Sequence, residues 1–232
     1  MMSVLPWWRR FYPVMNNVQL CVAITNNDVE AVKTIAPWID LFEVRIDLIG
    51  EGWQELVGHL GKPWIACNRK TEEGGSWHGS EQERTGELLK AVELGANIID
   101  IELSTPGVAG LVRQIKEKAE CLLSYHNLEG TPPLEEMKDI VRRQQHSGAD
   151  ICKVVTTAHN LPDNIAVLEL IREFPDLKVV SFAMGWAGQL SRVLCPLAGG
   201  YYTYASVEEG KESATGQLPA KVLREIYRLV KG

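Results

Sequence analysis

Two apolar segments of the chain each carry one side chain that could perform covalent or proton-transfer chemistry. Lys153 lies inside the largely apolar stretch 148–155, and His126 closes the apolar stretch 122–126. Burial lowers the pKa of a lysine and frees its amine to attack a carbonyl carbon, while a neutral imidazole can move a proton beside it. The pair therefore predicts Schiff-base chemistry with a histidine acid and base. Lys153 alone could instead be a strand-end lysine that reaches solvent, but two valines continue the apolar run beyond it.

Other charged side chains also lie at or near the ends of expected strands. Glu43 and Arg45 alternate about Val44, so both charges point to one face of their strand. Two charges are costly against a helix layer but suit the rim of a barrel lumen, where they can bind hydroxyls or a carboxylate. A structural ion pair explains these two residues equally well when they are considered alone. The remaining candidates at strand ends are Arg69, Asp100, Glu102 and Met184.

The elements that must position these residues alternate along the chain. Apolar, β-branched runs predict strands at 18–24, 40–46, 63–68, 97–102, 120–125, 150–155, 178–183 and 200–204. Amphipathic runs predict helices at 27–37, 52–60, 80–94, 105–118, 132–147, 161–173, 187–195 and 217–230. Eight such units indicate a closed, parallel (β/α)8 TIM barrel, an α/β fold, as a single catalytic domain over 18–232. The alternative is an open doubly wound sheet, but no Gly-x-Gly-x-x-Gly follows the first strand.

A barrel brings the carboxyl ends of its strands together in one mouth, so side chains far apart in sequence can meet there. Two loops on that side stand out, 69–80 and 205–216, because both are rich in glycine and charge. Catalytic groups of barrel enzymes collect on this face.

Composition excludes several classes of function. A formal net charge of −6 argues against nucleic-acid binding, and the five separated cysteines indicate buried thiols in a reducing cytosol. Because no His, Cys, Asp and Glu spacing matches a metal site, we expect no metal.

No apolar run is long enough to span a membrane. The segment 1–17 is expected to be an N-terminal arm that packs on the barrel or stays loose, with membrane contact through its tryptophans and arginines as the alternative.

Seven segments, taken together and in order, resemble the type I 3-dehydroquinate dehydratase family of the shikimate pathway. The resemblance covers roughly residues 18–230. Its motifs are Glu43-Val44-Arg45-Ile46-Asp47, Arg69 to Gly75, Ile99 to Leu103, Ser124-Tyr125-His126-Asn127, the 148–155 run with Lys153, Met184-Gly185 followed by Ser191-Arg192, and Ser213-Ala214-Thr215-Gly216-Gln217. Each motif alone is weak, but seven in family order form a specific signal.

The resemblance implies a lyase that needs no metal or cofactor and converts 3-dehydroquinate to 3-dehydroshikimate. Lys153 is expected to condense with the C3 ketone, and His126 to remove a C2 proton and then assist departure of the C1 hydroxyl. Glu73 is expected to orient His126. Asp100 and Met184 are expected to lie just behind the residues that contact substrate.

The resemblance also implies how the substrate is held. Arg192 is expected to bind the carboxylate with its planar guanidinium, together with Ser213 and Gln217. The expected contacts to the ring oxygens are Glu43, Arg45 and Arg69. The loop 205–216 is expected to close as a lid, and Thr215 stands where the family usually has proline, which removes a fixed φ angle.

Two other functions remain open from the sequence. A class I aldolase or transaldolase is also a barrel with a Schiff-base lysine, and a non-catalytic sensor could bind dehydroquinate without reacting. Retention of Lys153, His126 and Glu73 together argues against the sensor. The expected partner is the small-molecule substrate, without nucleic acid or membrane. By family analogy we expect a homodimer, and a cytoplasmic location.

Overall fold

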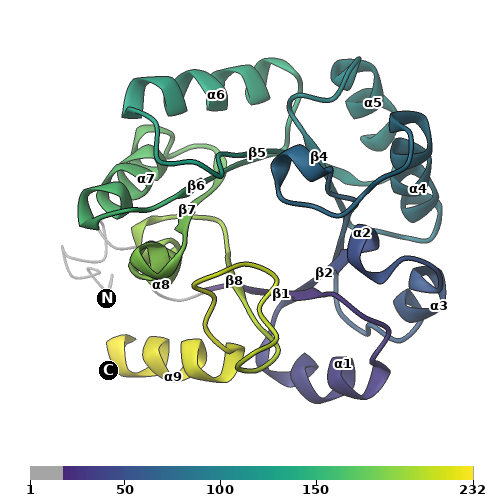
Figure 1. Ribbon diagram of the computed structural model, residues 1–232, viewed down its shortest axis with the longest axis horizontal. Helices are drawn as coiled ribbons and strands as arrows, with labels where there is room; N and C mark the ends of the chain where they lie inside the picture. The colour runs from purple at the N-terminus through teal and green to yellow at the C-terminus, as the bar shows by residue number, and fades with distance from the viewer. Residues whose placement is uncertain (1–17, 232) are drawn as a thin grey trace, which may run out of the picture.

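The computed structural model describes residues 18–231, and these form one ring of strands surrounded by helices (Figure 1). All eight strands pair in parallel in the order β7-β6-β5-β4-β3-β2-β1-β8, so neighbours in sequence are neighbours in space. The strands are β1 (Leu20–Ile24), β2 (Leu41–Arg45), β3 (Trp64–Cys67), β4 (Ile98–Glu102), β5 (Glu120–His126), β6 (Ile151–Thr157), β7 (Lys178–Met184) and β8 (Thr203–Ala205).

The helices lie outside this ring and cover the outer faces of the strands (Figure 1). They are α1 (Val29–Ile35), α2 (Ile46–Ile49), α3 (Trp53–Val57), α4 (Glu81–Glu93), α5 (Val108–Ile115), α6 (Leu134–His146), α7 (Leu161–Glu173), α8 (Gln189–Leu194) and α9 (Ala220–Lys231). Short 3₁₀ turns occur at η3 (Ala36–Trp38), η4 (Thr71–Glu73), η5 (Trp186–Gly188) and η6 (Pro196–Ala198). Capping boxes at Ser80 and Asn160 begin α4 and α7, since each cap satisfies backbone N–H groups of the first turn.

The ring closes through contacts between the two ends of the sheet. Strand β1 pairs with β8, where Leu20 lies opposite Thr203. The segment before β8 meets β7, because the Tyr201 backbone N–H donates to the Val179 carbonyl at 2.8 Å. The predicted (β/α)8 barrel is therefore confirmed.

Strand residues alternate between the lumen and the helix layer, and this alternation positions the site. On β6, Lys153, Val155 and Thr157 line a cavity at the strand ends, whereas the alternate residues Cys152, Val154 and Thr156 do not line it and are buried. Strand β6 continues two residues beyond the predicted 150–155, so Lys153 lies in mid-strand.

The last strand differs most from its prediction at 200–204, because β8 covers only 203–205. Pro196 begins η6, and Gly199 at φ +103 turns the chain back, so ladder pairing begins only at Thr203. The short helix α2 and the turn η4 were not predicted. The expected arm 1–17 and its membrane alternative lie outside the described residues. Within 18–231, no helix has the length and apolar character needed to cross a membrane.

Candidate active site

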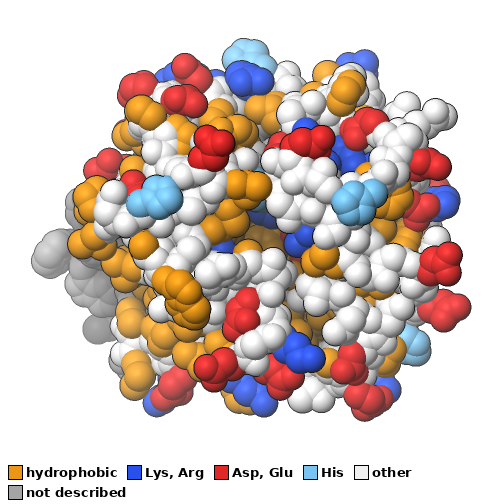
Figure 2. Space-filling view, viewed as in Figure 1, with side chains coloured by type: hydrophobic (Ala, Val, Ile, Leu, Met, Phe, Trp, Pro, Cys, Tyr) orange, Lys and Arg blue, Asp and Glu red, His pale blue; other side chains and the backbone are white. Residues whose placement is uncertain are grey.

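The predicted site residues gather around one cavity of about 400 Å³ at the carboxyl ends of the strands. Figure 2 shows the molecule hollowed near the centre of the ring, with basic side chains inside the hollow. The predicted residues that line it are Glu43, Arg45, Arg69, Glu73, His126, Lys153, Met184, Arg192, Ser213 and Gln217. Met184 thus lines the cavity rather than lying behind it, while Asp100 is buried beneath Lys153.

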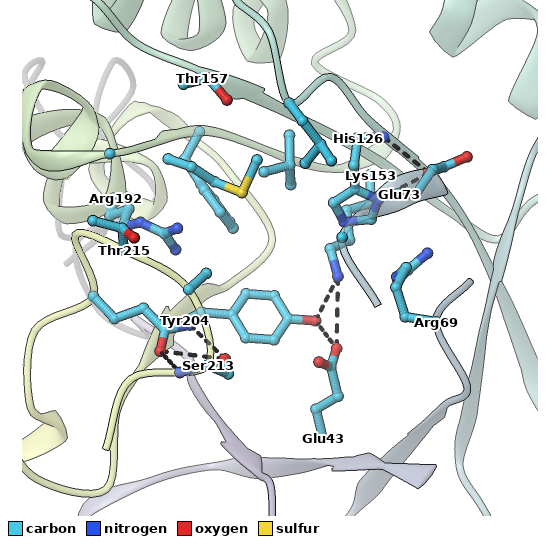
Figure 3. A pocket seen from close by; sticks show the side chains of 18 of the residues that line it. Glu43, Arg69, Glu73, His126, Lys153, Thr157, Arg192, Tyr204, Ser213 and Thr215 are labelled. Atoms are coloured by element: carbon cyan, nitrogen blue, oxygen red, sulfur yellow. Dashed lines mark hydrogen bonds and ion pairs between the residues drawn. The ribbon is translucent and has the colours of Figure 1, made fainter. Parts of the chain in front are cut away.

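Lys153 lies at the bottom of this cavity with only 4% of its surface exposed. Its ammonium donates to the Asp100 carboxylate at 2.9 Å. Figure 3 shows its two other contacts, to the Tyr204 hydroxyl at 3.0 Å and to the Glu43 carboxylate at 3.6 Å. Burial lowers the pKa of Lys153, but the charges of Asp100 and Glu43 outweigh it and raise the pKa above its usual value. The expectation that burial alone frees the amine is therefore wrong: the resting side chain is an ammonium.

Asp100 is held as an anion by several donors at once. It accepts from the Ser124 hydroxyl at 2.6 Å and forms an ion pair with Arg69 at 2.8 Å, besides its bond from Lys153. Burial raises the pKa of Asp100, but the charges of Arg69 and Lys153 lower it by more. The net pKa of Asp100 is therefore well below its usual value. Arg69 also pairs with Glu102 at 3.0 Å, which fixes the guanidinium beside the cavity.

His126 ends β5 and is oriented by Glu73 from the turn η4. One oxygen of Glu73, Oε2, lies 3.0 Å from the His126 ring Nδ1 and accepts from the His126 backbone N–H at 3.0 Å. The other, Oε1, accepts from Ser104 at 2.9 Å. Burial, then the charges of Arg69 and Lys153, hold the pKa of His126 well below its usual value. A neutral ring beside a carboxylate carries its proton on Nδ1, which leaves Nε2 as the base.

Arg45 at the end of β2 is positioned by Asp47. Its guanidinium donates to the two Asp47 oxygens at 2.9 and 2.6 Å, and Asp47 also accepts from the Ser76 backbone N–H at 3.0 Å. Burial opposes the charge of Arg45, but the bonds to Asp47 raise its pKa above the usual value. Glu43 and Arg45 both line the cavity, as their alternation about Val44 predicted.

Arg192 on α8 differs from the paired cations of the cavity, because its charge has no anionic partner among residues 18–231. The side chain is 2% exposed and stacks over the Phe182 ring at 4.5 Å. Its Nε and Nη2 atoms are buried and make no hydrogen bond to any described residue. Burial lowers its pKa to about 10. A buried guanidinium with unused donors that faces a cavity is a site for a carboxylate or another anion.

The loop after β8 covers one side of the cavity. Ser213 and Gln217 bind each other there, since the Gln217 amide donates to the Ser213 hydroxyl at 2.9 Å (Figure 3). The Thr215 carbonyl accepts from the Gly185 backbone N–H at 3.1 Å. Gly216 has φ +87, and a Cβ there would lie 2.4 Å from the Gly185 carbonyl oxygen. The loop is thus seated against the end of β7 by contacts that need glycine.

Several cavity residues were not predicted. Tyr204 bridges Lys153 and Glu43, and apolar side chains of Phe182, Trp186 and Leu128 complete the wall. Tyr204 lies at even spacing from Tyr202 on an expected strand, so alternation could have placed it in the lumen. Its pairing with Glu43 required the closed ring.

Glu43, Cys67 and Asp100 form a buried group whose ligand atoms lie within 4.8 Å of one another. We assign no metal to this group, because Lys153, Arg69 and Tyr204 already bind its carboxylates, and burial raises the pKa of the Cys67 thiol well above its usual value. The absence of a metal stays a prediction.

The fold and the cavity together define a (β/α)8-barrel enzyme with a lysine and a histidine in one polar mouth. The family model described as type I 3-dehydroquinase matches residues 20–232. A 3-dehydroquinate dehydratase from Dehalococcoides mccartyi is 44% identical over 217 residues, which cover 93% of this chain and 97% of that protein. This chain belongs to the type I 3-dehydroquinase family, as its seven motifs predicted.

Solved structures agree with this assignment. The crystal structure of the 3-dehydroquinate dehydratase from Aquifex aeolicus is 27% identical, with a TM-score of 0.78 over 91% of this chain and 98% of that one. The type I enzyme from Clostridium difficile superimposes with a TM-score of 0.83 over 92% of each chain. At 24% identity the second comparison supports the fold alone.

Proposed function

We propose that this protein dehydrates 3-dehydroquinate to 3-dehydroshikimate through a Schiff base on Lys153, with His126 as the acid and base. The observation that carries the proposal is the shared cavity, which is lined by the buried side chain of Lys153 and by the His126 ring, whose pKa is held well below its usual value. Membership of the type I 3-dehydroquinase family supplies the substrate. The shikimate pathway, which this reaction serves, is the corresponding biosynthetic context.

The reaction begins when Lys153 gives up one ammonium proton and its amine attacks the C3 ketone, which gives a carbinolamine. The carbinolamine hydroxyl takes up that proton and leaves as water, which gives an iminium. The iminium withdraws electrons from the adjacent C2–H bond, so Nε2 of His126 can remove that proton and leave an enamine. The enamine electrons expel the C1 hydroxyl, which takes the proton back from His126 and leaves as water. Hydrolysis of the product iminium restores Lys153 and releases 3-dehydroshikimate. Glu73 keeps Nε2 available throughout, because it binds Nδ1.

The substrate carboxylate binds the unused donors of Arg192, which form parallel bonds to its two oxygens. Ser213 and Gln217 exchange their mutual bond for bonds to this carboxylate. On the opposite rim Glu43, Arg45 and Arg69 hold the ring oxygens. Charged groups at both ends of the cavity fix the ring with C3 toward Lys153.

The proposal is tested by borohydride reduction in the presence of 3-dehydroquinate, followed by intact mass and peptide mapping. We expect a trapped adduct on Lys153 and no adduct in the Lys153→Met variant, whose fold is checked by circular dichroism. Trapping only with a sugar phosphate would indicate an aldolase. Binding of 3-dehydroquinate without any adduct would indicate a sensor, and either result would overturn the proposal.

The loop 205–216 closes over bound substrate in this proposal and excludes water from the iminium. Its exposed tip, 208–212, is the part open to protease, and its base is seated against Gly185. Saturating substrate should slow cleavage of the tip, whereas equal rates with and without substrate would contradict closure. The homodimer and the cytoplasmic location stay predictions, and light scattering of the purified protein tests the first.

A further inference from the structure

The mechanism requires a neutral amine, yet the site stabilises Lys153 as an ammonium. Its charge is favoured by Asp100 and Glu43, which raise the pKa of Lys153 against the effect of burial. Before attack, one proton must therefore leave Nζ. Two oxygens accept hydrogen bonds from Nζ, the Tyr204 hydroxyl at 3.0 Å and Oδ2 of Asp100 at 2.9 Å, whereas Oε2 of Glu43 lies at 3.6 Å, beyond hydrogen-bond distance.

Asp100 is a poor acceptor for this proton. Its oxygens already bind Arg69 and Ser124, and these donors favour the charged carboxylate. Glu43 is less satisfied, because among residues 18–231 it binds only the Tyr204 hydroxyl and the more distant Lys153 ammonium. Glu43 therefore has the less occupied carboxylate, but it forms no direct hydrogen bond with Lys153.

Tyr204 connects these two groups. Its hydroxyl donates to Glu43 and accepts from Lys153, so the three atoms form a directed chain from ammonium to carboxylate (Figure 3). The Tyr202 hydroxyl lies 3.4 Å away on the other side. Burial and then the Glu43 charge raise the pKa of Tyr204 well above its usual value, so the phenol stays protonated and can only pass a proton through.

We propose that the Tyr204 hydroxyl carries one proton from Lys153 to Glu43 and so generates the nucleophilic amine. The Tyr204 O–H bond breaks as its proton moves to Oε2 of Glu43, and one Nζ–H bond of Lys153 breaks as that proton moves to the Tyr204 oxygen. The products are a neutral amine, a neutral carboxylic acid and an unchanged phenol. Glu43 returns its proton through Tyr204 to the carbinolamine hydroxyl, which then leaves as water. Hydrolysis of the product iminium releases the proton that restores the Lys153 ammonium. The inference rests on the proposed Schiff-base function.

An internal transfer has a distinct signature, because it changes no net protonation. The rate of iminium formation in the wild-type enzyme is then nearly independent of pH around neutrality. Without the relay, Lys153 must lose its proton to solvent, and the rate rises about tenfold per pH unit below the lysine pKa. The titratable or charged groups that face the lysine are Cys21 from β1, Glu43 from β2, Cys67 and Arg69 from β3 and its loop, Asp100 from β4, His126 from β5 and Tyr204 from β8.

The test compares Tyr204→Phe with the wild type by rapid mixing with 3-dehydroquinate and a borohydride quench, from about pH 6 to about pH 9. Phenylalanine keeps the ring that stacks at 4.6 Å from the ammonium and removes only the hydroxyl. We expect adduct on Lys153 to form at least about tenfold more slowly at neutral pH, with recovery as the pH rises. Tyr227→Phe is the matched control, since it removes a buried hydroxyl that donates to Val193 outside the cavity, and its rates should equal the wild type.

The outcomes separate this inference from the proposed function. Adduct on Lys153 that forms equally fast in Tyr204→Phe would overturn the relay and leave the Schiff base intact, as would a slowing that is the same at every pH. The wild-type profile is a second measurement that needs no variant to fold, and a tenfold rise per pH unit there would also overturn the relay. Absence of any wild-type adduct would refute the proposed function, and the relay with it.

Discussion

The two ends of the cavity differ in whether their buried charges are paired. At the lysine end, every charge is paired: Lys153 binds Asp100, Asp100 binds Arg69, and Arg69 binds Glu102. At the other end, Arg192 is equally buried but has no anionic partner among the described residues. Paired charges hold the reacting groups in fixed positions before substrate arrives, whereas an unpaired guanidinium stores a desolvation cost that a bound carboxylate relieves. The difference separates the chemical half of the site from the recognition half.

The largest expected effect comes from the chemical half. His126→Ala should lower turnover by about 10²- to 10⁴-fold, because general acid and base catalysis typically contributes that much. Borohydride should still trap substrate on Lys153, since the imidazole acts after the iminium has formed. Turnover at the wild-type rate would remove His126 from the mechanism, and loss of trapping would assign it to an earlier step.

Arg192→Leu tests the recognition half of the site, where we expect the change to weaken substrate binding. We expect KM to rise by about 10- to 100-fold, because a charge-assisted pair to the carboxylate is lost. The substrate-free variant should be more stable than the wild type by about 1 kcal/mol, since an unsatisfied buried charge is replaced by an apolar side chain. Urea unfolding and steady-state kinetics measure both, with the exposed Arg172→Leu as the control. A destabilised variant with normal KM would contradict the assignment.

The dependence of folding stability on acidic pH should report on His126 in the chemical half of the site. The folded protein holds the pKa of His126 well below its usual value, so below about pH 6.5 the unfolded chain binds a proton that the folded chain does not. The free energy of unfolding should therefore fall as pH falls, by up to about 1.4 kcal/mol per pH unit from this group. His126→Gln should lose that slope and the exposed His146→Gln should keep it. Equal slopes in wild type and His126→Gln would show that the ring titrates normally.

The smallest expected effect concerns the loop 205–216, which covers one side of the cavity. Thr215→Pro should slow protease cleavage and raise stability by about 0.5 kcal/mol, because proline restricts the unfolded chain. The Thr215 carbonyl that binds Gly185 is retained, and within 18–231 the Thr215 backbone N–H makes no backbone hydrogen bond that proline would remove. Thr215→Ala controls for the lost side chain. A clear rise in KM for the proline variant alone would mean that the loop needs its freedom.

Most of the fold was predictable because its signals are local. Each parallel strand is buried on both faces and reads as an apolar run, and α7 was predicted with its observed bounds, 161–173. The prediction placed β8 too early in the chain, because Pro196 and Gly199 delay the start of strand pairing until Thr203. Glu43 and His126 were predictable as site residues because side chains at the ends of barrel strands share one cavity. Glu73, Arg192, Ser213 and Gln217 lie outside the strands, and only the family resemblance predicted them.

The amino-acid order by itself determined that Lys153 lies within one strand and His126 ends another in an eightfold barrel, because side-chain alternation and strand–helix repetition are properties of the chain. Only the tertiary structure decided their protonation. Asp100 lies 53 residues before Lys153, and it raises the lysine pKa that burial alone lowers. Electrostatic shifts depend on distances in space, so the charged lysine, the neutral histidine, the unpaired Arg192 and the tyrosine between Lys153 and Glu43 arise from closure of the barrel.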